Sequence, residues 1–157
     1  SGLPGTGKTT IARELARKLS AVHIRIDTIE QALRDKGLTV VDEGYRVAYA
    51  LAEDNLRLGL TIIADSVNPL QLTRDAWRTV AARAGAKSID VEIICSNAEE
   101  HRRRVEARQP DIANHHLPRW DDVIKREYHA WQQYRLVIDT ASVTPESAVT
   151  RICSALG

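Results

Sequence analysis

Apolar positions along the chain follow two periods, one typical of strands and the other typical of helices. Short runs with strand character cover residues 22–26, 60–64, 89–95 and 136–138. The run at 60–64 is nearly continuously apolar, as expected of a parallel strand covered on both faces. Between these runs, apolar residues recur every three or four positions, which indicates amphipathic helices. The predicted helices cover residues 7–20, 28–36, 43–58, 72–84, 98–108, 120–131 and 144–157.

This alternation of strands and helices predicts an α/β fold, with a parallel sheet between two helical layers. In such folds ligands bind at the carboxyl ends of the strands, so the functional residues are expected in the loops that follow the strands. In the helix at 43–58, Val47, Leu51 and Leu58 are predicted to point inward. The 157 residues contain no repeat or linker, which predicts a single domain over 1–157.

The first ten residues match the phosphate-binding pattern G-x-x-x-x-G-K-[ST] at all four of its defined positions. Glycines allow the backbone to curl around a phosphate, and the helix that follows directs its dipole at the same anion. Lys8 is then expected to reach the outer phosphates, and the hydroxyl of Thr9 to bind Mg²⁺. The predicted nucleotide-binding residues of this phosphate loop are Gly2, Pro4, Gly5, Thr6, Gly7, Lys8, Thr9 and Thr10.

Only Ser1 precedes the phosphate loop, although such a loop normally connects a buried strand to a helix. We therefore expect a short apolar strand upstream of Ser1. The nucleotide is expected to be ATP, since the Asn-Lys-x-Asp motif of GTP-binding proteins is absent from the sequence.

Two aspartates follow predicted strands, at the edge of the sheet where phosphates would lie. Asp65 follows the apolar strand at 60–64 and is the predicted magnesium ligand, together with Thr9. The next residue is Ser66 rather than the Glu that activates water in mechanical ATPases, which argues against a motor. Asp27 is the candidate base for a substrate hydroxyl. The alternative is that Asp27 only caps the helix that begins at Thr28.

Arg104 and Arg108 share one face of the basic helix at 98–108, ahead of an irregular segment. Because arginine forks stabilise the charge of a moving phosphoryl group, we expect both in a lid covering about 104–120. The alternative for the whole basic run is an RNA-binding stripe. Asn68, followed by Pro69, either forms only a turn or orients a substrate. Arg74 and Arg78 are expected to face solvent.

The bulk composition narrows the class of protein without identifying a substrate. The formal net charge is +1, which argues neither for nor against nucleic acid. Cys95 and Cys153 lie far apart in apolar segments and are interpreted as buried, reduced thiols of a cytoplasmic protein. No apolar run approaches membrane-spanning length, so no membrane partner is expected. His115 and His116 lack nearby metal-ligand spacing and are interpreted as surface residues.

The chain resembles the P-loop kinase superfamily, specifically the small AAA-type or zeta-toxin-like kinases. It has a frame similar to gluconate kinases, chloramphenicol phosphotransferases and polynucleotide 5′-hydroxyl kinases. The resemblance rests on residues 2–10, 62–68, 98–108 and 136–140, together with Asp27. It implies a three-layer α/β/α P-loop NTPase fold with a five-stranded parallel sheet, the upstream strand being central.

The same resemblance implies a role for individual residues. These are Lys8 and Thr9 for ATP and Mg²⁺, Asp27 as the catalytic base, Arg104 and Arg108 in the lid, and Asp139 and Thr140 beside the adenine. One departure is that the Arg often found shortly after the base is missing here.

These observations predict an ATP-dependent kinase that moves the γ-phosphoryl group of ATP to a hydroxyl of a small molecule. The predicted catalytic residues are Lys8, Asp27, Arg104 and Arg108. One alternative is a 5′-hydroxyl kinase of RNA or other polynucleotides, and another is an ATP-binding regulatory module that transfers nothing. The protein is expected to be a monomer or a homodimer. The acceptor pocket has no shared pattern that would identify the substrate.

Overall fold

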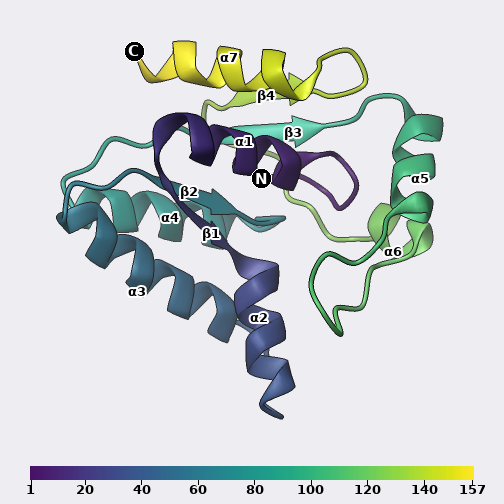
Figure 1. The fold of residues 1–157 in the computed structure, drawn as a ribbon, viewed down its shortest axis with the longest axis horizontal. Helices are drawn as coiled ribbons and strands as arrows, with labels where there is room; N and C mark the ends of the chain where they lie inside the picture. The colour runs from purple at the N-terminus through teal and green to yellow at the C-terminus, as the bar shows by residue number, and fades with distance from the viewer.

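The computed structural model describes residues 1–157 as alternating helices and short strands (Figure 1). The elements are α1 (Lys8–Leu19), β1 (Val22–Arg25), α2 (Ile26–Asp35), α3 (Glu43–Arg57), β2 (Ile62–Asp65), α4 (Gln71–Arg83), β3 (Val91–Ile94), α5 (Ala98–Ala107), α6 (Trp120–Ile124), β4 (Leu136–Asp139) and α7 (Pro145–Leu156). None of these helices combines the length and the apolar character needed to cross a membrane.

The four strands form two parallel pairs rather than one continuous sheet. β1 pairs with β2, which sets Arg25 opposite Asp65, and β3 pairs with β4, which sets Ile94 opposite Asp139. Residues 1–157 supply four strands, and β2 and β3 are not hydrogen-bonded to each other. The predicted five-stranded sheet includes one further, central strand. The strand expected upstream of Ser1 concerns residues outside this range and stays a prediction. Parallel pairing still brings the carboxyl end of each strand to the same side as that of its partner.

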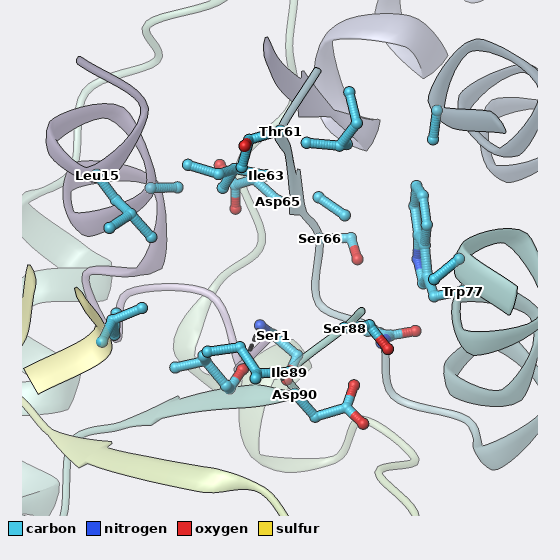
Figure 2. Close-up of a pocket in the computed structure, with 18 of the residues that line it drawn as sticks. Ser1, Leu15, Thr61, Ile63, Asp65, Ser66, Trp77, Ser88, Ile89 and Asp90 are labelled. Carbon is cyan, nitrogen blue, oxygen red and sulfur yellow. Dashed lines mark hydrogen bonds between the residues drawn. The ribbon is translucent and has the colours of Figure 1, made fainter. Parts of the chain in front are cut away.

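A cavity of about 350 Å³ lies between the two strand pairs (Figure 2). Its walls are mostly apolar and include Leu15 of α1 and Ile63 of β2. The first residues of the chain connect the two pairs beside this cavity. Ile93 donates its backbone N–H to the carbonyl of Ser1 at 2.9 Å, and Gly2 donates to the carbonyl of Val67 at 3.2 Å. The phosphate loop thus begins from a point attached both to β3 and to the segment after β2.

Each strand pair has its own hydrophobic core. One core joins α1 and α7 to the β3–β4 pair, and the other joins α3 and α4 to β1. The first comprises Ile11, Leu15, Ile93, Ile138, Ala148, Val149 and Ile152, and the second comprises Ile24, Ile26, Ala48, Ala52 and Val80. Burial of each of the large aliphatic side chains contributes about 1.5–3 kcal/mol.

The inward face of α3 differs from the prediction. Val47, Leu51 and Leu58 are exposed, whereas Ala48 and Ala52 are buried. Small residues occupy the inner face because α3 packs closely against α2. At Gly44, an added Cβ would lie only 2.3 Å from Cγ of Glu30.

Candidate active site

The phosphate loop has the backbone that its glycines predict. Gly5 has φ +85° and Gly7 has φ +91°, both in the left-handed region that favours glycine. A Cβ on Gly5 would also lie 2.5 Å from Cγ2 of Val105. α1 then starts without a side-chain cap and without an acidic residue in its first turn. Its first N–H groups and its dipole are therefore suited to bind an anion.

A polar cavity of about 220 Å³ adjoins this loop. Its lining contains no hydrophobic residue and brings the loop together with the two predicted lid arginines. The lining residues are Gly5, Gly7, Lys8, Thr9, Thr10, Arg13, Arg104, Arg108, Gln109 and Asp111. Cationic side chains and helix N–H groups around a polar pocket are typical of a phosphate site.

Lys8 and Asp65 form the buried ionic centre of the site. Burial lowers the pKa of Lys8, while the carboxylates of Asp65 and Asp27 oppose that change. Burial by itself would raise the pKa of Asp65, but a hydrogen bond from His23, the Lys8 ammonium and the Thr9 hydroxyl lower it overall. The His23 Nε2–Asp65 Oδ2 distance is 3.2 Å. Asp65 is therefore held ionised beside Thr9, at the end of β2.

These oxygen donors fit a magnesium ion that is shared with a bound nucleotide. Mg²⁺ prefers carboxylate, hydroxyl, phosphate and water oxygens, and it usually takes only one or two protein ligands. Thr9 and Asp65 supply that number. No group of three or more His, Cys, Asp or Glu side chains forms a metal site of its own anywhere in the chain.

Arg104 is connected to the phosphate loop through Thr140. It donates from Nε to Glu100 at 2.7 Å, from Nη1 to the Thr140 hydroxyl at 2.8 Å and from Nη2 to the Thr140 carbonyl at 3.0 Å. The Thr140 hydroxyl in turn donates to the carbonyl of Thr6 at 2.9 Å. The carboxylate of Asp139 accepts from the backbone N–H groups of Ser96 and Ala141, both at 3.0 Å. Arg104 is thus fixed at the wall of the cavity. Asp139 instead connects the turn after β4 to the residues that follow β3.

Asp27 lies in the first turn of α2 and does not cap it. The helix begins at Ile26, two residues before the predicted start, and its N-cap residue is Arg25, without a side-chain cap bond. The capping alternative for Asp27 is therefore wrong. Its Oδ2 atom lies 3.5 Å from Nη2 of Arg25, and about a quarter of its side chain is exposed. The carboxylate is close enough to Lys8 to affect its pKa.

Asn68, in the turn after β2, and Tyr45, on α3, form a contact that the sequence did not predict. Asn68 has φ +51°, is buried, and donates its backbone N–H to the Tyr45 hydroxyl at 3.3 Å. Its Oδ1 atom is buried without a hydrogen-bond partner. Leaving such an atom unpaired costs about 1–3 kcal/mol, which marks it as a group retained for a ligand or for water. The apolar periodicity of α3 offered no signal for Tyr45.

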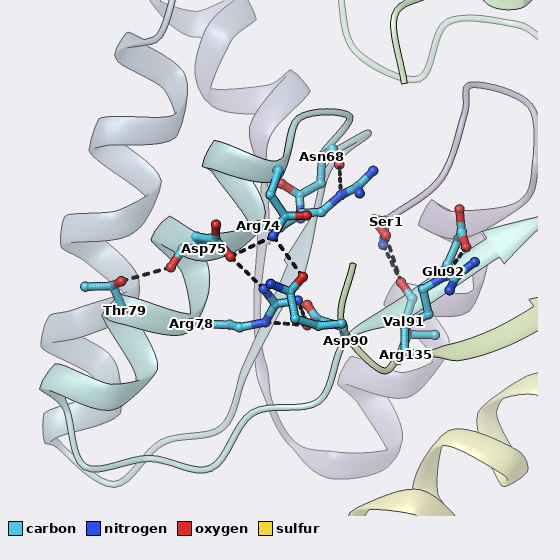
Figure 3. A network of polar contacts seen from close by, with 12 residues as sticks. Ser1, Asn68, Arg74, Asp75, Arg78, Thr79, Asp90, Val91, Glu92 and Arg135 are labelled. Carbon is cyan, nitrogen blue, oxygen red and sulfur yellow. Dashed lines mark hydrogen bonds and ion pairs between the residues drawn. The ribbon is translucent and has the colours of Figure 1, made fainter. Parts of the chain in front are cut away.

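Arg74 is fully buried, so its predicted exposure to solvent is wrong (Figure 3). Its guanidinium donates to four backbone carbonyls at 2.9–3.3 Å, those of Asn68, Pro69, His129 and Ala130. The rings of Tyr128 and Trp131 lie 5.0 and 4.0 Å from its Cζ atom. α6 ends at Ile124 rather than near Trp131, and the backbone N–H of His129 donates to the carbonyl of Pro69 at 2.8 Å instead of continuing the helix. Arg74 therefore positions the turn that carries Asn68.

The chain is similar in sequence to a protein family and to a kinase. Residues 1–128 match the family model AAA_33, described as an AAA domain. A probable adenylyl-sulfate kinase of Aeropyrum pernix is 27% identical over 166 residues, covering 98% of this chain and 88% of that protein.

Two solved structures have a similar fold. The APS kinase of Mycobacterium tuberculosis, in complex with AMPPNP and APS, superposes with a TM-score of 0.74 at 19% identity and covers 99% of this chain and 94% of its own. A gluconokinase from Sinorhizobium meliloti superposes with a TM-score of 0.64 at 15% identity, covering 99% and 91%. The overall arrangement is therefore the three-layer α/β/α P-loop fold.

Proposed function

Because this chain belongs to the AAA_33 family of P-loop kinases, we propose that it transfers the γ-phosphoryl group of ATP to a hydroxyl of a small molecule. The observation that carries the proposal is the single polar cavity shared by Lys8, Thr9, Arg104 and Arg108, with the carboxylates of Asp27 and Asp65 close to Lys8. The adenylyl-sulfate kinase relative supports a small-molecule acceptor.

The residues around the cavity fit ATP together with Mg²⁺. ATP supplies the phosphoryl group when it is bound. Lys8 would hold the outer phosphates, and Thr9 and Asp65 would hold the metal. Arg104 and Arg108 neutralise the charge that develops on the transferred group. His23 keeps the Asp65 carboxylate oriented through its hydrogen bond.

Asp27 acts as the proton acceptor for the attacking hydroxyl. Its carboxylate lies on the first turn of α2, with a guanidinium 3.5 Å away to hold its orientation. Residue 66 is a buried serine, so the position after Asp65 carries no carboxylate to activate water. Transfer to an organic hydroxyl, rather than ATP hydrolysis, fits that arrangement.

The structure favours a small molecule over a polynucleotide as acceptor. Arg102 pairs with Glu106 at 2.8 Å and Arg103 pairs with Glu100 at 2.7 Å. Acidic partners on the same helix neutralise the basic run that suggested an RNA-binding stripe. The cytoplasmic location and the monomeric or homodimeric state stay predictions.

The test is an ADP-release screen over sugars, sugar acids, nucleosides, adenylyl sulfate and short RNAs, with Asp27→Asn as the blank. We expect Asp27→Asn to lower kcat by about 10²–10⁴-fold, the usual contribution of a general base, and to leave the Kd for ATP unchanged. Asp42→Asn, an equal change at an exposed position before α3, serves as the matched control.

Three outcomes would contradict parts of the proposal. Unchanged turnover in Asp27→Asn would remove Asp27 from the mechanism. Phosphorylation of RNA alone would support the polynucleotide alternative. Tight ATP binding with no phosphorylated product from any acceptor would support a regulatory module.

A further inference from the structure

Asp111, in the segment between α5 and α6, lies among three arginines from three separate elements. Its carboxylate accepts from Arg13 of α1 at 2.7 Å and from Arg25 of β1 at 2.7 and 3.1 Å. Arg108, just after α5, lies 4.0 Å away.

Arg25 is an unusual residue to find at a buried strand end. Its side chain is only 4% exposed, and its Nε atom is buried without a hydrogen-bond partner. The bidentate contact with Asp111 has the geometry with which guanidinium groups bind carboxylates, phosphates and sulfates. Arg25 also lies 3.5 Å from Asp27, so it borders the proposed catalytic base.

Asp111 also lines the polar cavity beside the phosphate loop, together with Lys8, Arg13 and Arg108. Its carboxylate therefore belongs both to the cavity and to the arginine cluster next to it. The hydrogen bond from Arg25 holds the pKa of Asp111 well below its usual range, with a further contribution from Arg13. Asp111 thus remains an anion at neutral pH, and it faces a site whose other charged side chains are cationic.

We propose that Arg13, Arg25 and Arg108 form an anion-binding site and that Asp111 fills it until an anionic group of a ligand takes its place. The inference rests on the proposed function for its location, because the site adjoins both the phosphate loop and Asp27. The ligand group is a phosphate, a sulfate or a carboxylate. It belongs either to the outer part of the nucleotide or to an acceptor that is itself anionic.

The exchange is physically easy on the side of Asp111. Its side chain is about one third exposed, and its pair with the exposed Arg13 is a surface ion pair, which contributes only about 0–1 kcal/mol. Apart from the bonds of Asp111, residues 108–118 make one side-chain hydrogen bond to other elements, from Asn114 to Asp35 at 3.5 Å. An incoming phosphate would repel the carboxylate and attract the same guanidinium groups. Irregular segments of this kind serve as lids in many enzymes.

The test measures binding of inorganic sulfate by calorimetry and involves no turnover. We expect Asp111→Asn to bind sulfate about tenfold more tightly than the wild type, as when an internal competitor fills the site nine-tenths of the time. Glu106→Gln makes the same change in net charge at an exposed ion pair of α5 and should leave the affinity unchanged.

Repeating the titration with saturating AMPPNP and Mg²⁺ distinguishes the two sources of the anion. If the gain in sulfate affinity persists, the site receives an anionic group of the acceptor. If AMPPNP itself binds Asp111→Asn more tightly and abolishes the sulfate gain, the site receives a phosphate of the nucleotide.

Adding Arg13→Gln or Arg25→Gln to Asp111→Asn should remove the gain. Arg13 is included because its side chain is exposed, so its substitution should leave the fold intact even if a change at buried Arg25 does not. Equal sulfate and AMPPNP affinities in Asp111→Asn and the wild type would overturn the proposal. A gain in sulfate affinity without any phosphorylated acceptor would instead refute the kinase function and leave the anion site standing.

Discussion

The site has a donor side and an acceptor side, and the two are built in different ways. On the donor side, ten consecutive residues supply the loop, the lysine and the hydroxyl that fit a nucleotide with its metal. On the proposed acceptor side, Asp27, Tyr45 and Asn68 come from three separate segments. The donor side therefore depends on a local backbone conformation, whereas the acceptor side depends on how distant elements pack.

This contrast predicts where mutations will act. Changes in the phosphate loop should reduce nucleotide affinity and rate together, because backbone and Lys8 contact the same phosphates. Changes on the acceptor side should lower the rate and leave nucleotide affinity unchanged, since they do not alter the nucleotide pocket. The predictions that follow test this separation.

Of Lys8→Ala, Arg74→Met and Glu100→Gln, the first is expected to have the largest effect. Loss of the buried ammonium removes a charge-assisted contact to the phosphates in the ground state and in the transition state. Removal of one such stabilising group lowers kcat by about 10²–10³-fold, and we expect ATP affinity to fall as well. Steady-state kinetics and calorimetry with AMPPNP measure both quantities.

Lys18→Ala, at an exposed position in the last turn of α1, is the matched control and should change neither. If Lys8→Ala lowered kcat while AMPPNP bound as in the wild type, the donor side would not act as one unit.

An intermediate effect is expected from Arg74→Met, which tests the long-range packing of the acceptor side. The substitution leaves the carbonyls of Asn68, His129 and Ala130 without a donor, while that of Pro69 keeps the N–H of His129. It also removes the guanidinium from the rings of Tyr128 and Trp131. We expect the free energy of unfolding to fall by about 3 kcal/mol. Because the turn carrying Asn68 loses its support, KM for the acceptor should rise while the Kd for ATP stays close to that of the wild type.

Urea unfolding and ATP titration measure the two consequences of Arg74→Met. Arg83→Met, at an exposed position of the same helix, controls for the loss of one positive charge. A loss of ATP affinity as large as the loss of acceptor affinity would show that the two sides are mechanically coupled.

The smallest effect is expected from Glu100→Gln, which loosens Arg104 on the donor side. Hydrogen bonds from Arg103 and Arg104 lower the pKa of Glu100 from its ordinary 4.5 to about 2. A carboxylate whose pKa is lowered by folding stabilises the fold at any pH above its pKa in the unfolded state. This contribution is lost as the pH falls from about 4.5 to about 2. The wild type should therefore lose melting temperature over this interval more steeply than Glu100→Gln.

We also expect kcat of Glu100→Gln to fall only a few-fold, since Thr140 still holds the Arg104 guanidinium. Circular dichroism melts between pH 2 and pH 6 follow the stability. Glu106→Gln, which lacks a contact with Arg104, should keep the slope of the wild type. Identical slopes in Glu100→Gln and the wild type would contradict the assigned pKa.

Several elements could be predicted because their signals are local. The apolar run at 60–64 predicts a strand, and β2 covers Ile62–Asp65. The helical period at 144–157 predicts a helix, and α7 covers Pro145–Leu156. Thr144 indeed caps that helix by accepting from the N–H of Ser147. Helical spacing alone predicts that Arg104 and Arg108 share a face, and both line the polar cavity. Each of these features depends on residues within a few positions of one another.

Other features were missed because their causes lie far away in the sequence. Apolar periodicity placed Val47 and Leu51 inside, but the close approach of α2 at Gly44 selects the alanines of α3 instead. The segment after Ile124 has helical spacing, yet its carbonyls bind Arg74 across more than fifty residues. Nothing in the sequence near Arg74 signals that its charge is buried.

The sequence by itself determined the donor side, because the glycines, Lys8 and Thr9 act through a backbone conformation that ten adjacent residues specify. It also identified the strand-end acids, Asp27 and Asp65. Only the tertiary structure decided that Asp27 is free of capping and that Arg25 and Asp111 meet beside it. Such contacts join side chains nearly ninety residues apart. Their geometry depends on the packing of whole elements, which no local pattern encodes.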